Sequence, residues 1–215
     1  QKICIPSHVK KISKSAFELC KNLSHVTFES NSELKSIGKF AFAHSAIEDF
    51  TIPDKVEEIK YGCFCGTESL NSIKIDVKNK FIQYYKNQFL LTKSDPKSDN
   101  FDILLFANRN IEEVIIPSFI KHINAFAFER CSHINHFDFA PDSEIQIIDD
   151  HALSSTSVKE FVIPKYVTRI GVKSFAYSKA ENIKFAANSR LKTIDNDAFL
   201  LSKIESISIP SCVAN

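Results

Sequence analysis

The sequence contains very little glycine, with four glycines in 215 residues, and it has no tryptophan and no methionine. Loops that cradle phosphates or cofactors usually recruit glycine, because glycine takes positive φ and lets a ligand approach the backbone. Phosphate-binding folds are therefore disfavoured. Apolar runs that approach the roughly 18 residues of a membrane span are also absent. The start, Gln1-Lys2-Ile3-Cys4, lacks a signal-peptide layout and an initiator Met, so we expect an excised piece of a longer protein.

Charge of one sign is missing as well. The 27 basic and 26 acidic side chains leave a formal net charge of +1. This balance gives no global electrostatic reason to expect nucleic acid or an anionic membrane as a partner. With 44% hydrophobic and 25% charged residues, the composition is that of a folded chain, long enough for one large domain or two small ones.

What the sequence does have is a repeat. Ile-Pro pairs recur with spacings of 47, 64, 47 and 46 residues. They begin at Ile5, Ile52, Ile116, Ile163 and Ile209. Most of these spans divide again at an aromatic residue, Phe28, Phe139 or Phe185, into two alternating units of 22 to 24 residues. Self-similarity at this period predicts a stack of coils, each burying its apolar side against its neighbours.

A six-residue pattern, L-x-x-L-x-L, precedes each new unit. It occurs eight times, from Leu23-x-x-Val26-x-Phe28 to Ile204-x-x-Ile207-x-Ile209. Alternation of apolar and polar residues at its end predicts a short strand with one buried face, and the unit length matches the leucine-rich-repeat class. Proline after the strand has no N–H and ends the ladder. The register also predicts an internal aromatic column, formed by Phe17, Phe64, Phe128 and Phe175.

Two signatures carry a resemblance to a known family. They are the alternating I-P-x-x-V-x-x-I pattern and the x-A-F-x-x-C-x-x-L pattern of Ala16-Phe17-Glu18-Leu19-Cys20-Lys21-Asn22-Leu23 and Ala127-Phe128-Glu129-Arg130-Cys131. The chain resembles the BspA-like leucine-rich repeats over nearly its whole length. The resemblance implies a leucine-rich-repeat solenoid of the α/β class, mostly β. This is a right-handed superhelix of short parallel strands with an irregular or short-helical convex side. It also implies a family of bacterial and protist proteins, many surface-exposed, associated with adhesion and protein binding.

One stretch departs from the repeat. We expect residues 1–215 to form a single BspA-like domain in which residues 75–115, 18 longer than a regular unit, make a hairpin-like insertion. The polar segment Lys93–Asn100 between two β-rich runs reads as its turn. Its aromatic residues either cover neighbouring repeats or form a protruding lip that contacts a partner.

Residues capable of catalysis or metal binding do not converge in the predicted register. Cys63-Phe64-Cys65 is a lone C-x-C motif with only Cys63 expected to face inward. Asn31, Asp142 and Asn188 are expected to bond the turns that follow the Phe-type strands, as inward structural residues. His25 and His136 occupy one outward position five strands apart, too far to share a metal. We therefore expect no enzyme, no cofactor and no metal site.

The variable positions of the strand motif predict a binding surface instead. They point outward, onto the concave wall of a solenoid, and carry eight acidic and three basic side chains. The candidate partner-binding residues are Glu48, Asp49, Glu112, Glu113, Asp138, Glu160, Glu181 and Glu205. An acidic wall favours a basic protein surface, such as that of a host or matrix protein. The alternative is an ordinary solvated face with scattered charge.

Two function classes follow. The first is a non-enzymatic protein-binding or adhesion module at the cell surface or outside the cell. The second is a cytoplasmic scaffold or receptor-type repeat domain built on the same spine. Neither end of the sequence shows a polar capping repeat, which indicates a longer array or end-to-end self-association of copies.

Overall fold

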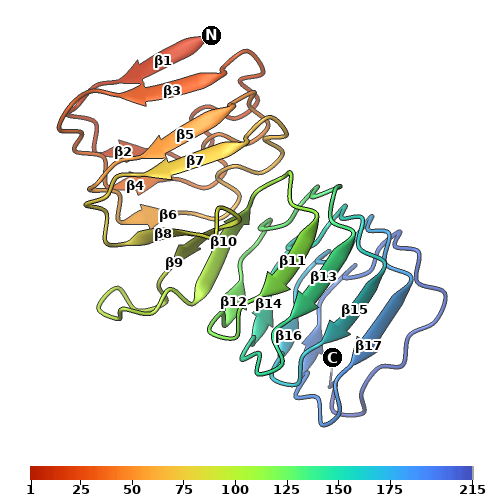
Figure 1. Ribbon diagram of the computed structural model, residues 1–215. Coiled ribbons are helices and arrows are strands. Elements are labelled where there is room, and N and C mark those ends of the chain that lie inside the picture. Colours follow the sequence, from red (N-terminus) through yellow and green to blue (C-terminus); the bar gives the residue numbers. More distant parts are fainter. Residues whose placement is uncertain (215) are drawn as a thin grey trace. The chain divides into compact units, whose positions relative to one another are not determined.

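The computed structural model describes residues 1–214, and within them the chain forms strands and turns but no helix. It divides into two compact units. Unit 1 comprises residues 1–101 with 105–109, and unit 2 comprises 102–104 with the chain from residue 110 onward. Each unit is a stack of coils (Figure 1). The predicted mostly-β leucine-rich-repeat solenoid is confirmed. The sequence left open whether the convex side is irregular or short-helical, and in the described residues it is irregular.

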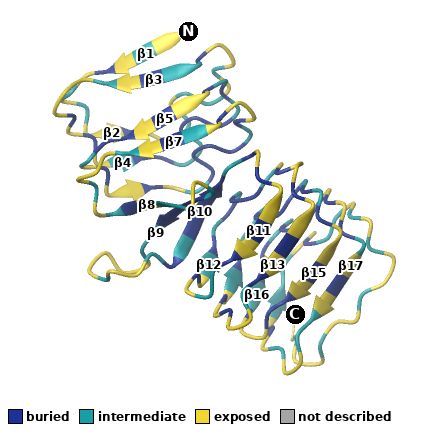
Figure 2. Ribbon diagram, viewed as in Figure 1, coloured by how far each residue is buried: buried dark blue, intermediate teal, exposed yellow. Residues whose placement is uncertain are grey.

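Each coil contributes one four-residue strand to a parallel front sheet. In unit 1 these strands are β1 (Lys2–Ile5), β3 (His25–Phe28), β5 (Asp49–Ile52) and β7 (Ser72–Ile75). In unit 2 they are β11 (Glu113–Ile116), β13 (His136–Phe139), β15 (Glu160–Ile163) and β17 (Asn182–Phe185). More buried and more exposed residues alternate along these strands, as Figure 2 shows. This alternation is the period of two that the L-x-x-L-x-L motif predicted.

A second side of each coil is a two-residue strand centred on the Ile that follows the corner. Unit 1 has β2 (Lys11–Ile12), β4 (Ser36–Ile37) and β6 (Glu58–Ile59). Unit 2 has β12 (His122–Ile123), β14 (Ile147–Ile148), β16 (Arg169–Ile170) and β18 (Thr193–Ile194). These strands pair in parallel, in register, with the neighbouring coil. The last Ile of each strand is buried and closes the core from this side, except Ile194 of β18, which is half-buried.

The third side is a ladder without regular strands, which sequence reasoning did not anticipate. Within each coil, two residues four positions apart have left-handed backbones with φ between 52° and 65°. In unit 2 these pairs are 126 and 130, 151 and 155, 173 and 177, and 197 and 201. The N–H groups of alternate residues bond the next coil, as in Phe128 to the carbonyl of Ala152 at 2.8 Å. Because most of these positions are not glycine, the inter-coil bonds must offset the cost of positive φ.

Aromatic rings form the predicted internal column, but with more members than the sequence indicated. In unit 1, Phe17 stacks on Phe42 at 5.2 Å and Phe42 on Phe64 at 6.0 Å between ring centroids. In unit 2, the coil that carries Leu153 lies between those of Phe128 and Phe175. Every coil supplies a member because both unit types place an apolar side chain at this position. Phe17 belongs to the first coil and is only half-buried.

The irregular stretch folds around a hairpin of β8 (Ile82–Tyr85) and β9 (Phe89–Thr92), which pair antiparallel. The turn of this hairpin lies at Lys86 and Asn87, both with positive φ, where the sequence indicated none. The polar segment 93–100, which the sequence indicated as a turn, connects β9 to its neighbour in the sheet, β10 (Ile103–Ala107). Residues 89–91 are buried, and the rings of Phe81, Tyr84 and Tyr85 are half-buried. The structure therefore favours the covering role of these aromatics over a protruding lip.

Two further expectations need correction. Residues 204–209 form no strand, although they carry the eighth copy of the motif, and Ile209 is 43% exposed. Asn31, Asp142 and Asn188 point outward and are exposed. The serine that follows each of them bonds the turn, as in Leu34 N–H to Ser32 Oγ at 3.3 Å and Ile145 N–H to Ser143 Oγ at 3.4 Å. A hydroxyl on a short side chain fits this tight corner, while the Asx residue takes the left-handed backbone at two of the three corners.

The front strands pair over their full length only at alternate interfaces. β1–β3, β5–β7, β11–β13 and β15–β17 each pair over four residues. In each pair, the residue after the second strand donates its N–H to the last carbonyl of the first strand, as Ala140 does to Ile116 at 3.0 Å. At the next interface this donor is replaced by Pro53 or Pro164, which has no N–H.

The ladder is correspondingly weaker where proline stands. β3 and β5 pair over only two residues, and the described residues include no strand pairing between β13 and β15. We call the interface between β13 and β15 the seam. The same replacement, by Pro210, stands after residues 204–209, which form no strand. Strand pairing is therefore shorter or missing at the interfaces where an Ile-Pro pair stands.

Candidate acidic binding surface

The candidate site is the outward side of the front strands, which backbone ladders hold in register within each strand pair. Seven of the eight predicted residues are exposed, and Glu181 is half-buried. Asp49, Glu113, Asp138 and Glu160 lie on strands. Glu48, Glu112 and Glu181 directly precede a strand, and Glu205 lies in an irregular segment. All eight therefore face solvent from the positions that the motif assigned to them.

The acidic character belongs to unit 2. Its front positions carry six acidic residues against Lys159 and Lys184. We call these six the acidic surface: Glu112, Glu113, Asp138, Glu160, Glu181 and Glu205. In unit 1 the face is closer to neutral, because Asp49 Oδ2 lies 3.0 Å from His25 Nδ1 and β1 adds Lys2 in register with His25. Sequence reasoning missed Lys2 because its strand precedes the first complete motif.

Register aligns the outward side chains of unit 2 in two rows. Glu113 lies beside His136, and Glu160 beside Asn182. In the second row Ile115 lies beside Asp138, and Val162 beside Lys184. Ile115 and Val162 are 60% and 52% exposed, so apolar side chains are interspersed with the carboxylates. Mixed acidic and aliphatic contacts of this kind suit a protein partner better than a small anion or a sugar phosphate.

A groove of about 400 Å³ follows the seam. Asp138 and His136 of β13 line one side of it, and Glu160 and Val162 of β15 line the other. At its edge Lys159 Nζ lies 3.5 Å from Glu181 Oε1, so these two charges offset each other. Among the residues that line the groove, the carboxylates of Asp138 and Glu160 are therefore not paired with Lys159.

The C-x-C motif is a core feature. Cys63 and Cys65 are both buried, at 3% and 5% exposure, which corrects the expectation that only Cys63 faces inward. Both lie between the left-handed residues Gly62 and Gly66, in a stretch where three consecutive residues, 63–65, are buried. Burial raises the pKa of the Cys63 thiol well above its usual range. Ala127 and Ala198 fill the equivalent small slot elsewhere and are buried, whereas Ala16 in the first coil is exposed.

Thiol labelling tests this assignment. Within the described residues none of the six cysteines forms a disulfide, and Cys4 and Cys212 are exposed. We expect these two to react with an aromatic disulfide reagent within minutes at pH 8, because the thiolate is the reactive form and must be accessible. Cys63, Cys65 and Cys131 are expected to react at least 100-fold more slowly, at the rate of unfolding. Mass spectrometry of labelled peptides identifies the sites. Rapid labelling of Cys63 in the folded protein would contradict the inward register.

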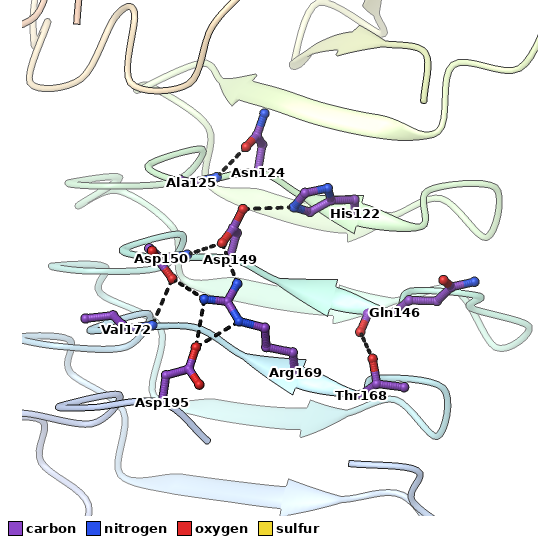
Figure 3. Close-up of polar contacts among 10 residues, drawn as sticks. All are labelled: His122, Asn124, Ala125, Gln146, Asp149, Asp150, Thr168, Arg169, Val172 and Asp195. Atoms are coloured by element: carbon purple, nitrogen blue, oxygen red, sulfur yellow. Dashed lines mark hydrogen bonds and ion pairs between the residues drawn. The ribbon is translucent and has the colours of Figure 1, made fainter. Parts of the chain in front are cut away.

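A charged network on the second side of unit 2 escaped sequence reasoning. Arg169 of β16 bonds Asp149 at 2.6 Å, Asp150 at 2.6 Å and Asp195 at 2.7 Å, and Asp149 also lies 3.1 Å from His122 (Figure 3). Burial acts to raise the pKa of Asp149, but the bonds from His122 and Arg169 outweigh it and hold that pKa well below its usual range. Every member is already partnered, so this network links coils and is not a binding site.

The described residues include no cluster of three or more His, Cys, Asp or Glu side chains arranged to hold a metal ion. Among them there is also no helix of the length and apolarity that a bilayer span requires. His25 and His136 begin β3 and β13, as the register predicted, and they belong to different units.

Comparison with solved structures gives the same fold. PcpA, a pneumococcal vaccine antigen, superposes with a TM-score of 0.74 at 19% identity, covering 99% of this chain and 61% of that protein. A leucine-rich repeat protein from Eubacterium ventriosum gives 0.70 at 19% identity, with 99% and 73% coverage. A leucine-rich cell surface protein from Faecalibacterium prausnitzii gives 0.59 at 19% identity, with 89% and 63% coverage. The chain thus spans about three fifths of PcpA.

Sequence comparison identifies the repeat itself. Among curated proteins, none is significantly similar to this chain. The family described as "BspA type Leucine rich repeat region" matches residues 1–94 and 101–215, in six copies. These matches cover both units and nearly every coil. The chain therefore belongs to the BspA-type leucine-rich repeat family.

Proposed function

We propose that this chain is a non-enzymatic protein-binding module that captures a basic protein surface on the acidic surface of unit 2. The observation that carries the proposal is the concentration of exposed carboxylates on the outward side of two hydrogen-bonded strand pairs, β11–β13 and β15–β17. A preorganised array loses little entropy on binding, and its summed field accelerates the approach of a basic partner. The family and its leucine-rich repeat fold support a binding role, because solenoids present extended faces built from variable positions.

The proposed location is the cell surface, with adhesion as the activity. Two similar structures support it: one is described as a cell surface protein and another as a vaccine antigen. An intracellular scaffold or receptor-type module is the alternative. Labelling of intact cells with a membrane-impermeant reagent distinguishes the two, because only a surface protein is labelled before lysis. Residues Glu48 and Asp49 of unit 1 belong to the proposal as a smaller, separate contact.

Charge reversal tests the binding surface. The probe is an array of immobilised 15-residue peptides with net charges from −4 to +4. We expect binding to rise with positive charge and to weaken at least tenfold between 50 and 300 mM salt, since exposed charges are screened over about 10 Å at 0.1 M. Glu112→Lys, Glu113→Lys and Glu160→Lys combined should abolish this binding.

The matched control reverses three carboxylates elsewhere in unit 2, Asp142→Lys, Glu144→Lys and Asp197→Lys. It changes net charge by the same amount and should bind the basic peptides within about twofold of the natural chain. If the control loses binding as fully as the test variant, only net charge matters and the proposed surface is wrong. Equal binding of acidic and basic peptides would also refute it.

A further inference from the structure

Within the acidic surface, the groove at the seam between β13 and β15 combines two carboxylates, Asp138 and Glu160, with the apolar side chain of Val162. We propose that it is the pocket that receives a single arginine or lysine side chain from an extended segment of the protein partner. This inference rests on the proposed function and names the place where binding energy concentrates. It is argued from the groove, its charges and the backbone that forms it.

The backbone makes the groove. β13 and β15 are not paired in the described chain, and Pro164 lacks the N–H that would reach the last carbonyl of β13. The strands on both sides, β11–β13 and β15–β17, pair over four residues and are rigid by comparison. A depression of about 400 Å³ therefore lies between two firm walls. Carbonyls along this edge of β13 are not used by a ladder with β15.

The lining selects a cation with an apolar stem. Asp138 Oδ1 accepts a bond from the N–H of Phe139 at 2.8 Å, which orients the carboxylate. The carboxylate of Glu160 makes no side-chain bond or ion pair within the described residues and is exposed. Carboxylates and carbonyls are acceptors only, and guanidinium and ammonium groups are donors only, so the two sets are complementary. Val162 at 52% exposure offers an apolar wall for the methylene stem.

The charge balance points to one such side chain. Lys159 lies beside Glu181 and does not neutralise Asp138 or Glu160. His136 on the near wall adds a ring against which a planar guanidinium can stack. A groove of this size holds one side chain and part of a backbone, not a folded surface. The rest of the partner is then held by the surrounding acidic surface.

The test uses two peptides that differ only in charge. Ac-GGRGG-NH2 carries arginine, and Ac-GG(Cit)GG-NH2 carries the neutral isostere citrulline. In ¹⁵N-resolved NMR titrations of the whole chain we expect arginine to shift the amides of β13 and β15 and citrulline to leave them unchanged. Asp138→Asn with Glu160→Gln should weaken arginine binding at least tenfold. Val162→Trp, which fills the groove without altering charge, should do the same.

The control Asp142→Asn with Glu144→Gln removes two nearby charges outside the front face and should leave arginine binding unchanged. Glu112→Gln with Glu113→Gln should weaken it by no more than about threefold, through the long-range field. Circular dichroism of each variant verifies folding. If arginine shifts the amides of β11 as strongly, or if Val162→Trp binds normally, the pocket is wrong while the proposed function stands. If neither the arginine peptide nor the 15-residue basic peptides bind, the proposed function fails as well.

Discussion

Phe128→Ala is expected to lower the free energy of unfolding by roughly 3–5 kcal/mol. Phe128 is fully buried, and its ring lies 5.3 Å from that of Phe137 in an edge-on contact. Its own N–H is bonded to Ala152 of the next coil, so the backbone cannot move inward to fill the space that the ring leaves. The loss therefore includes both the transfer free energy of the ring and the cavity.

Urea unfolding followed by circular dichroism measures this loss. Tyr177→Ala is the matched control, because Tyr177 lies on the same third ladder but its side chain is 54% exposed. That variant should lose less than about 1 kcal/mol. A cost below about 1 kcal/mol for Phe128→Ala would mean that the column does not carry the core. A comparable loss in both variants would point to backbone strain instead of packing.

Arg169→Met is expected to cost about 2 kcal/mol at pH 7, less than the sum of its charged hydrogen bonds because the guanidinium is partly exposed and screened. Arg169 joins carboxylates on both neighbouring coils, Asp149 with Asp150 on one and Asp195 on the other (Figure 3). Removing it leaves three carboxylates close together, with His122 as the remaining partner of Asp149. Lysine cannot replace it fully, because the planar guanidinium bonds several acceptors at once.

The pH dependence of this cost has a definite sign. The pKa of Asp149 is lowered in the folded protein by His122 and Arg169, against the opposing effect of burial. A depressed carboxyl pKa stabilises the fold above the ordinary pKa of an unfolded Asp, about 3.9, and this contribution is lost as pH falls through the folded value. The difference between the natural chain and Arg169→Met should therefore be largest between about pH 5 and 7 and should shrink below about pH 3.

Thermal and urea unfolding across pH 2–7 test this expectation. Lys192→Met, which removes an exposed charge near β18, should change stability by less than about 0.5 kcal/mol at every pH. A double-mutant cycle with Asp149→Asn should give a coupling energy of at least about 1 kcal/mol. A cost that does not vary with pH would show that the methylene stem of Arg169, and not its charge, supports the coils.

The sequence determined the repeat, and the reason is the alternation of side chains along a strand. Residues such as Val26, Phe50 and Phe161 must face inward once their neighbours face solvent. The Ile-Pro corners and the exposure of the candidate acidic residues follow from the same register. The sequence did not reveal the position of the turn between β8 and β9. The residues with positive φ there are Lys86 and Asn87, and glycine, the usual signal for positive φ, is absent from this turn. The exposure of Asn31 depended on the competing Ser32, which bonds the turn.

Tertiary structure alone decided which side chains on neighbouring coils meet. Arg169 and its three carboxylates are 19 to 26 residues apart in sequence, and only stacking of the coils in register brings them within bonding distance. The groove at the seam has the same origin. Pro164 is visible in the sequence as a corner. Its missing N–H matters only because stacking of the coils places the carbonyl of Phe139, at the end of β13, opposite Pro164. Periodicity fixes what faces inward, whereas contacts between coils depend on the three-dimensional register.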